Sequence, residues 1–268
     1  MSGARAPILL IGAGRMGGAL AKGWLACGLG PVVAVEPKPP AALSRLKGLS
    51  FVSSFDDIPQ RRWRACVVAL KPQVLKTEAA RLAPHAASGM PMISIAAGTS
   101  VKFLAKQWGK RARIVRAMPN TPGSIGRGIS ALYAAPQATA KDKKLAEALL
   151  GAVGQTVWVK SEVLIDAVTA VSGSGPAYVF ALCEALAAAG EAAGLSRIVA
   201  ERLARATVCG AGALLDVDPR PAAELRRDVT SPGGTTEAAL KILTTEDGLQ
   251  RLMTRAVAAA KKRAEELS

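Results

Sequence analysis

The sequence predicts an α/β fold for its first part, built on a doubly wound parallel sheet, and an all-helical second part. Apolar runs of strand length alternate with helical patterns over residues 1–160. The strand-like runs then disappear, and Ala-rich helical periods fill residues 161–268. Alternation of this kind is typical of a parallel sheet with helices on both faces. The chain therefore divides into two predicted domains, 1–160 and 161–268.

Short apolar runs in the first domain define the expected strands. They are Pro7–Ile11, Pro31–Glu36, Ser50–Ser53, Ala65–Leu70, Met90–Ala96 and Arg113–Met118, and two more near Gly128–Tyr133 and Gln155–Val159 extend the sheet. Helical patterns separate these runs. They cover about Met16–Cys27, Ala41–Leu46, Gln73–Leu82, Val101–Trp108 and Lys141–Leu149.

The second domain is predicted to consist of helices rich in small residues. They are about Pro176–Ala193, Ser196–Asp216, Pro221–Arg227, Thr235–Leu243 and Asp247–Glu266. Glycines such as Gly190, Gly210 and Gly212 each cost helix stability of about 1 kcal/mol relative to alanine. Close approach of helices would offset that cost, so we expect this domain to pack against a second copy of the chain.

The net charge of +15 is the unusual feature of the composition. A basic surface attracts nucleic acid, anionic lipid or small anions. The Lys and Arg residues are dispersed, and aromatic side chains are not interleaved with them as stacking platforms for bases. We therefore expect no nucleic-acid binding, and attribute the charge to the source proteome and to attraction for anionic substrates.

No stretch reaches the roughly 18 uninterrupted apolar residues of a membrane-spanning helix, so no membrane association is expected. The segment after Arg5 resembles a short signal peptide, but it continues at once into a glycine-rich turn, which favours a buried strand. The cysteines Cys27, Cys66, Cys183 and Cys209 are scattered without metal-type spacing. This pattern predicts thiols in a reducing compartment, hence a cytoplasmic protein, and no metal site.

A glycine loop joins the first expected strand to the first helix. Gly12, Gly14 and Gly17 fit the pattern G-x-G-x-x-G, with Arg15 and Met16 between the last two. The three glycines permit a tight turn, close approach of a pyrophosphate, and close helix–strand packing, while free N–H groups at the helix N-terminus face the phosphates. The alternative is a glycine turn without a ligand. The strand–loop–helix context favours a Rossmann-type dinucleotide site.

The choice of nicotinamide cofactor stays open at this stage. Glu36 ends the second expected strand, where an acidic residue accepts the ribose hydroxyls of NAD and repels a 2′-phosphate. Lys38 lies two residues after Glu36, and Arg15 lies in the glycine loop, and either cation could neutralise such a phosphate. The sequence is therefore compatible with NADPH or NADH.

Two further loops follow strands at the carboxyl edge of the sheet, where ligands bind in open α/β folds. Ala69-Leu70-Lys71-Pro72 follows the fourth strand, and a run from Arg116 to Pro122 that includes Asn120 follows the sixth. Lys71 fits a phosphate or ribose contact, a proton donor or a solvated surface lysine, and the residues alone leave these alternatives open.

A loop rich in glycine and hydroxyl groups, Ser231-Pro-Gly-Gly-Thr-Thr236, leads into the expected helix near Thr235. The free N–H groups and partial positive charge at a helix N-terminus form a site for a small carboxylate. The alternative is ordinary helix capping with no ligand.

Taken together, these segments resemble the pyrroline-5-carboxylate reductase family, in the family's own order and over essentially the whole chain. The segments are the glycine loop, Ala69–Pro72, Ser94–Gly98, Arg116–Pro122, Val171–Tyr178 and Asp228–Thr236, of which Val229–Thr236 is the most specific. The resemblance implies an NAD(P)H-dependent oxidoreductase. Its reaction would be hydride transfer to the C=N bond of L-1-pyrroline-5-carboxylate, giving L-proline in the final step of proline biosynthesis.

The resemblance also implies roles for individual residues. Cofactor contacts are expected from Gly12, Gly14, Arg15, Met16, Gly17, Glu36, Ala69, Lys71, Pro72 and Asn120. Substrate contacts are expected from Ser231, Gly233, Gly234, Thr235 and Thr236, with the Thr236 hydroxyl as the catalytic group at the ring nitrogen. The C-terminal helices would form a dimerisation domain, giving a homodimer or higher homo-oligomer.

Two features depart from the family pattern: Glu36, and the lead-in from Asp218 to Glu224 before the substrate loop. His85, the sole histidine, lies away from every motif and is expected at the surface. A cyclic imine is basic enough to be partly protonated in solution, so no strong catalytic acid is required. The competing hypotheses are a β-hydroxyacid dehydrogenase or general imine reductase, and a nucleotide-sensing or nucleic-acid-binding protein. The dehydrogenase would need a catalytic lysine or acid on a helix of the second domain.

Overall fold

The computed structural model describes residues 6–267, and contacts divide them into two units. Unit 1 extends to Gly173 and includes the end of the chain from Ala260, while unit 2 is Ser174–Ala259. The last residues belong to unit 1 because the Leu267 carbonyl accepts a hydrogen bond from Lys76 Nζ at 3.3 Å. The boundary between the two units, at Gly173, thus lies later in the chain than the domain boundary expected at residue 160. The expected domain boundary stays a prediction.

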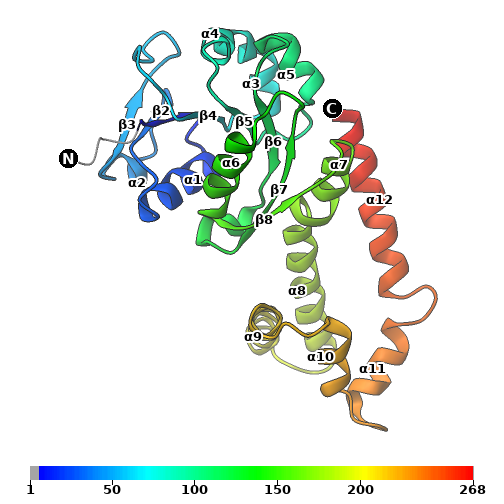
Figure 1. The fold of residues 1–268 in the computed structure, drawn as a ribbon. Coiled ribbons are helices and arrows are strands. Elements are labelled where there is room, and N and C mark those ends of the chain that lie inside the picture. Colours follow the sequence, from blue (N-terminus) through cyan, green and yellow to red (C-terminus); the bar gives the residue numbers. More distant parts are fainter. Residues whose placement is uncertain (1–5, 268) are drawn as a thin grey trace. The chain divides into compact units, whose positions relative to one another are not determined.

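Unit 1 contains an eight-stranded sheet of order β3-β2-β1-β4-β5-β6-β7-β8 (Figure 1). The strands are β1 (Ile8–Ile11), β2 (Val32–Val35), β3 (Leu49–Val52), β4 (Ala65–Val68), β5 (Met92–Ser94), β6 (Ile114–Met118), β7 (Gly128–Ala134) and β8 (Gly154–Trp158). Each overlaps an expected strand. The α/β class and the mostly parallel sheet are therefore confirmed.

Strand β7 runs antiparallel to β6, which corrects the expectation of a wholly parallel sheet. The link between them contains only the short η2 (Thr121–Ile125), whereas a parallel return needs a crossover of about a dozen residues or more. Helix α6 (Ala140–Gly151) supplies such a crossover, and β8 is accordingly parallel to β7. The length of the connection thus accounts for the direction of β7 relative to β6 and of β8 relative to β7.

Helices cover both faces of the sheet because side chains of each strand alternate between them. Ile8 and Leu10 of β1 point into one apolar cluster, and Leu9 and Ile11 into the other. The first cluster is closed by α1 (Arg15–Ala26), α2 (Ala41–Ser44) and α6, and the second by α3 (Pro72–Glu78), η1 (Ala79–Leu82), α4 (Ala83–Ala87) and α5 (Val101–Trp108).

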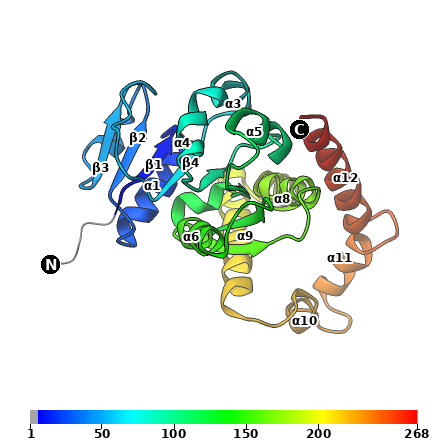
Figure 2. The ribbon, with the colours of Figure 1, turned by 45° about the horizontal axis from the view of Figure 1, so that its top comes forward.

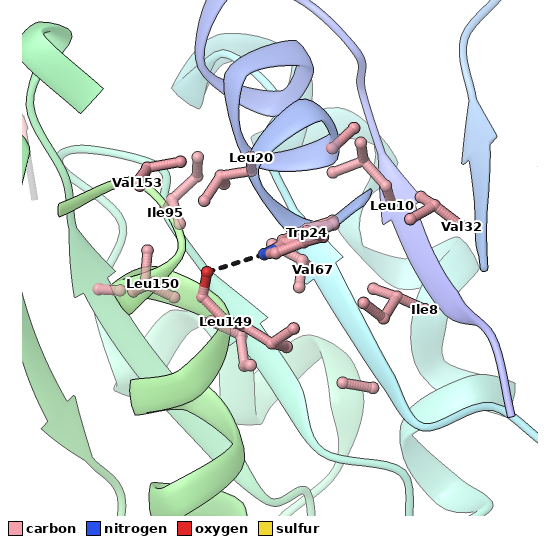
Figure 3. Close-up of a cluster of buried hydrophobic side chains, with 14 of the residues drawn as sticks. Ile8, Leu10, Leu20, Trp24, Val32, Val67, Ile95, Leu149, Leu150 and Val153 are labelled. Atoms are coloured by element: carbon pink, nitrogen blue, oxygen red, sulfur yellow. Dashed lines mark hydrogen bonds between the residues drawn. The ribbon is translucent and has the colours of Figure 1, made fainter. Parts of the chain in front are cut away.

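Trp24 of α1 lies at the centre of the first cluster and is fully buried (Figure 3). Its indole N–H donates to the Leu149 carbonyl of α6 at 2.8 Å. Burying an indole without a partner for its N–H would be costly, so this bond permits the large ring in the core. It also joins the helix that follows the glycine loop to a helix far along the chain.

Some helices differ from the expectation. The helix expected over Gln73–Leu82 is divided into α3 and η1. Helix α4 follows η1 and has Pro84 in its first turn, where the missing N–H of proline breaks no hydrogen bond of the helix. Helix α7 (Leu164–Val168) and the π-helix η3 (Thr169–Gly173) were not predicted. Helix α7 packs against β6 and β7, within unit 1.

Unit 2 holds α8 (Gly175–Ala192), α9 (Arg197–Val217), α10 (Ala222–Asp228), α11 (Thr235–Leu243) and the first part of α12 (Leu249–Leu267) (Figure 2). Helices α8 and α9 pack together, and a Cβ added at Gly190 would lie 3.2 Å from Cβ of Ala200. The buried apolar residues described in this unit are alanines, whereas Phe180, Ile198 and Val217 are 63%, 80% and 75% exposed. By itself, the unit leaves these three large apolar side chains uncovered.

Among residues 6–267, the structure contains no helix that is both long and apolar enough to cross a membrane.

Candidate active site

A cavity of about 630 Å³ opens at the carboxyl edge of the sheet in unit 1. Strand β1 has β2 on one side and β4 on the other, so the strand order reverses here, at the position where α/β folds bind ligands. The cavity is lined by Gly14, Arg15, Met16, Ala69, Leu70, Lys71, Pro72, Ile95, Ala96, Ala97, Met118 and Pro119. Four separate loops that the sequence placed after strands thus meet in one site.

The glycine loop has the geometry that a dinucleotide requires. Gly12 has φ +90°, in the region that favours glycine, and a Cβ there would lie 3.0 Å from the Ala69 carbonyl oxygen. A Cβ at Gly17 would collide with the Gly12 carbonyl, so only glycine allows α1 to start so close to β1. Gly14 faces open space and caps α1 without a side chain, which leaves the first-turn N–H groups accessible.

Glu36 is held against the glycine loop directly after β2. Its Oε2 accepts the Ala13 N–H at 3.0 Å, and its Oε1 accepts the Lys38 N–H at 3.2 Å. The carboxylate is therefore fixed beside the loop, where it would meet the adenosine ribose of a dinucleotide. Arg15 and Lys38 are exposed, with their charges on flexible side chains.

Lys71 and Pro72 lie at the start of α3, with Lys71 as the N-cap and Pro72 as the first helical residue. Both line the cavity, and the lysine is exposed. The geometry thus favours a ligand contact over a lysine remote from the site. Leu70, Ile95, Ala97 and Met118 line the same cavity but were not predicted as site residues. Their position directly after strands β4 and β5 and at the end of β6 was the available signal.

Asn120 follows the cavity-lining residues Met118 and Pro119 but is not itself among the lining residues. Its carboxamide oxygen accepts the Ile129 N–H at 2.9 Å, and its amide nitrogen donates to the Ser172 carbonyl at 3.1 Å. The side chain therefore joins the loop after β6 to the start of β7 and to η3. A direct cofactor contact by Asn120 stays a prediction.

Ser172 and Gly173, the last residues of η3, also approach this loop within unit 1. A Cβ at Gly173 would lie 2.8 Å from the methyl carbon of Met118, which lines the cavity. A side chain at position 173 would therefore displace the Met118 methyl group. This contact gives a physical reason for glycine in a segment whose role the sequence left open.

The loop Ser231–Thr236 lies in unit 2 and is described within that unit. Gly233 has φ +71°, and its N–H donates to Oε2 of Glu237 at 2.8 Å, while the Gly234 N–H donates to the Ser231 carbonyl at 3.0 Å. Gly234 is the N-cap of α11, and it has no side chain to cap the helix. The loop thus presents a helix N-terminus with one amide already bound to a carboxylate.

The lead-in to this loop, which departs from the family pattern, is held by an ion-pair cluster. Arg220 Nη2 lies 2.8 Å from Oδ2 of Asp218, and its Nη1 lies 2.8 Å from Oδ2 of Asp228, the last residue of α10. The Arg220 hydrogen bonds lower the pKa of Asp218 below its usual value. One guanidinium therefore ties both ends of the segment that precedes the loop.

Other titratable groups lie outside the cavity. His85 is on α4, and partial burial lowers the pKa of its imidazole. Cys66 lies within β4, and complete burial raises the pKa of its thiol, which keeps it protonated. Neither residue lines the cavity at the carboxyl edge, so neither is positioned to act there.

Family models match both parts of the chain. Residues 162–267 match the model described as pyrroline-5-carboxylate reductase dimerisation, and residues 7–98 match the one described as NADP oxidoreductase, coenzyme F420-dependent. Among curated proteins, the pyrroline-5-carboxylate reductase of Pseudomonas aeruginosa is 42% identical, covering 97% of this chain and 96% of the relative. That of Pisum sativum is 38% identical, covering 96% and 94%.

Solved structures give the same result. The structure of a pyrroline-5-carboxylate reductase from Coxiella burnetii superimposes with a TM-score of 0.90 at 36% identity, covering 98% of each chain. A pyrroline carboxylate reductase from Plasmodium falciparum, solved with NADP bound, superimposes with a TM-score of 0.82 at 27% identity, also over 98% of each chain.

Proposed function

This chain belongs to the pyrroline-5-carboxylate reductase family, as its full-length relatives show, and from that premise we propose how its residues perform the family reaction. The reaction is the NAD(P)H-dependent reduction of the C=N bond of 1-pyrroline-5-carboxylate to proline. The observation that carries the proposal is the presence, in one chain, of a cavity beside a glycine loop in unit 1 and of a loop rich in glycine and hydroxyl groups at the N-terminus of α11 in unit 2. A β-hydroxyacid dehydrogenase would account for the cavity in unit 1 but not for the loop before α11. A nucleic-acid-binding protein would account for neither feature.

The cavity at the carboxyl edge fits a nicotinamide dinucleotide. Gly14 leaves open space in front of the N-terminus of α1. There the pyrophosphate would accept hydrogen bonds from the backbone N–H groups of Arg15 and Met16. Glu36 would accept the adenosine ribose hydroxyls, and Ala69, Lys71 and Pro72 would hold the nicotinamide ribose. When bound, the reduced nicotinamide supplies the hydride. Gly12 and Gly17 keep the loop close enough to β1 for this arrangement.

The substrate carboxylate is assigned to the loop before α11. The Gly233 N–H already donates to a carboxylate, that of Glu237, which supports anion binding in this loop. The hydroxyls of Ser231 and Thr235 and the N–H groups of the first turn of α11 would add further donors.

Thr236 is proposed to hold the ring nitrogen through its hydroxyl group. The imine is partly protonated in solution, so the hydroxyl would accept the hydrogen bond from N–H⁺ of the protonated form and orient its C=N bond. Orientation at near-attack distance supplies much of the acceleration in such reactions. This fits a chain whose lone histidine lies on α4, outside the cavity.

The chain is proposed to act as a homodimer or a larger homo-oligomer. The matched dimerisation model spans the helices of unit 2, and the exposed Phe180, Ile198 and Val217 need a covering surface. A cytoplasmic location is also proposed, supported by four free cysteines, of which Cys27 and Cys209 are exposed.

The test is the loss of nicotinamide absorbance on addition of DL-pyrroline-5-carboxylate, run in parallel with NADPH and NADH. Rapid oxidation with at least one cofactor, and formation of proline, are expected. Folded protein that binds the cofactor but oxidises neither form with this imine would refute the proposal. Size measurement by light scattering on the same sample should give a multiple of the 27.5 kDa chain mass.

A further inference from the structure

A second cavity of unit 1, of about 990 Å³, lies at the amino edge of the sheet. Its walls include Pro7, Pro31, Arg64, Pro91 and Arg113, which directly precede β1, β2, β4, β5 and β6. These strands are parallel, so their amino ends share one edge, while the dinucleotide cavity lies at the other. The four-residue β1 alone separates the two edges by about 13 Å. The two cavities are therefore distinct sites.

The lining of this amino-edge cavity is strongly cationic. Its basic residues are Arg61, Arg62, Arg64, Arg113 and Lys141. Among the lining residues within 6–267, Asp142 is the sole acid. Its Oδ2 accepts the Thr139 N–H at 2.8 Å, and its Oδ1 lies 3.6 Å from Arg113 Nη1. The one negative charge is thus compensated within the wall, and the cavity keeps an excess of positive charge.

The cations fall into two groups. Arg64 and Arg113 are half-buried and donate to the backbone carbonyls of Leu29 and Gly89, so they form fixed walls. The other three are exposed and belong to two different segments: Arg61 and Arg62 precede β4, and Lys141 is in the first turn of α6. None of these three forms an ion pair with a residue in the described part of the chain. Their charges are available to a ligand.

We propose that the amino-edge cavity binds a small anion with two or three linked phosphate groups. Guanidinium groups bind phosphate oxygens in pairs, and basic side chains on opposite walls match a chain of phosphates better than a single ion. The volume falls within the roughly 300–1,000 Å³ of small-molecule sites. The cavity is concave, and Trp63 is the single aromatic residue among its lining residues. The guanidinium carbon of Arg61 lies 5.8 Å from the centre of the Trp63 ring and covers it. Single-stranded nucleic acid needs a series of aromatic stacking surfaces, so the lining favours a phosphate chain.

The test is isothermal titration calorimetry of the full chain with inorganic triphosphate, at saturating nicotinamide cofactor so that the glycine loop is occupied. One saturable event per chain is expected. In the double variant Arg61→Gln/Arg62→Gln the affinity should fall at least about ten-fold, the effect of losing one charge-assisted contact. The matched control Lys102→Gln/Lys106→Gln removes the same charge from exposed positions of α5 and should bind as the parent does.

A parallel titration with ATP identifies the source of the phosphates. Equal affinities would assign recognition to the phosphate chain, and tighter ATP binding would add a contact from the nucleoside, both in accord with the proposal. Lys141→Gln, which changes the other wall, should also weaken binding in protein that circular dichroism finds folded. Absence of triphosphate binding, equal losses in both double variants, or binding of duplex DNA without triphosphate binding would each overturn it.

Discussion

Arg116 of β6 donates through Nη1 to Oε1 of Glu162 at 2.9 Å, although the two residues are 46 positions apart. The same carboxylate oxygen accepts the N–H of Val101, the first residue of α5, at 2.6 Å. Arg116 is 3% exposed, and Asp166 of α7 lies 3.6 Å from its Nη2. A buried guanidinium thus joins β6, which ends at the dinucleotide cavity, to α5 and α7.

Replacing Glu162 with Gln should lower the free energy of unfolding by about 2 kcal/mol, measured by urea denaturation. Breaking a buried ion pair costs about 3–5 kcal/mol, and Asp166 remains to offset part of that loss. The exposed Glu147→Gln on α6 is the control and should change stability little. Equal effects of both substitutions would contradict a structural role for the pair.

Glu36→Gln should shift the cofactor preference toward NADPH. The amide oxygen can still accept the Ala13 N–H, but the negative charge that repels a 2′-phosphate is gone. The ratio of the NADPH to the NADH dissociation constant should fall about ten-fold, a change of about 1.4 kcal/mol. Fluorescence titration of each cofactor measures the ratio without substrate, and an unchanged ratio would remove Glu36 from cofactor selection.

Thr236→Val should reduce kcat/KM for the imine about 100-fold, the typical cost of losing one oriented hydrogen bond at a reacting group. Cofactor affinity should not change, because the glycine loop and Lys71 belong to unit 1. Thr236→Ser keeps the hydroxyl and should retain most of the activity. Similar activity in the Val variant and the parent would show that this hydroxyl does not act at the ring nitrogen.

Arg220→Gln should raise the KM for the imine about two- to five-fold while leaving cofactor affinity unchanged, in line with the small effects of exposed ion pairs. The substitution frees Asp218 and Asp228 and loosens the segment before the substrate loop. Arg197→Gln breaks another exposed pair, with Glu201 on α9, and serves as control. A matching rise of KM in the control would indicate a general charge effect.

Stability should decline as the pH falls below about 6.5, in part because of His85. Burial lowers the folded-state pKa of this imidazole below its ordinary value of 6.5. Between those two pKa values the unfolded chain binds a proton that the folded chain does not, so acid favours unfolding there. His85→Gln should therefore lose less unfolding free energy than the parent between pH 7 and about 5.5. An equal or larger loss would contradict this account.

Local patterns in the sequence determined the elements and part of the site. Strand, glycine loop and helix are contiguous around Gly12–Gly17, so their spacing alone predicted the dinucleotide loop, which the structure places at the cavity. The run Val229–Thr236 was sufficient to indicate the family, which the full-length relatives confirm. All eight strands also overlap runs that the sequence predicted, because strands buried in a sheet need runs of apolar residues.

Only the tertiary structure decided which distant residues meet. The Arg116–Glu162 pair, the contact of Gly173 with Met118, and the gathering of Arg61 and Lys141 at the amino-edge cavity have no local signature. Sequence periodicity reports which face of an element is apolar over a few residues. Which polar groups from separate elements become neighbours depends on how the sheet and its helices pack, and hence on the whole of unit 1.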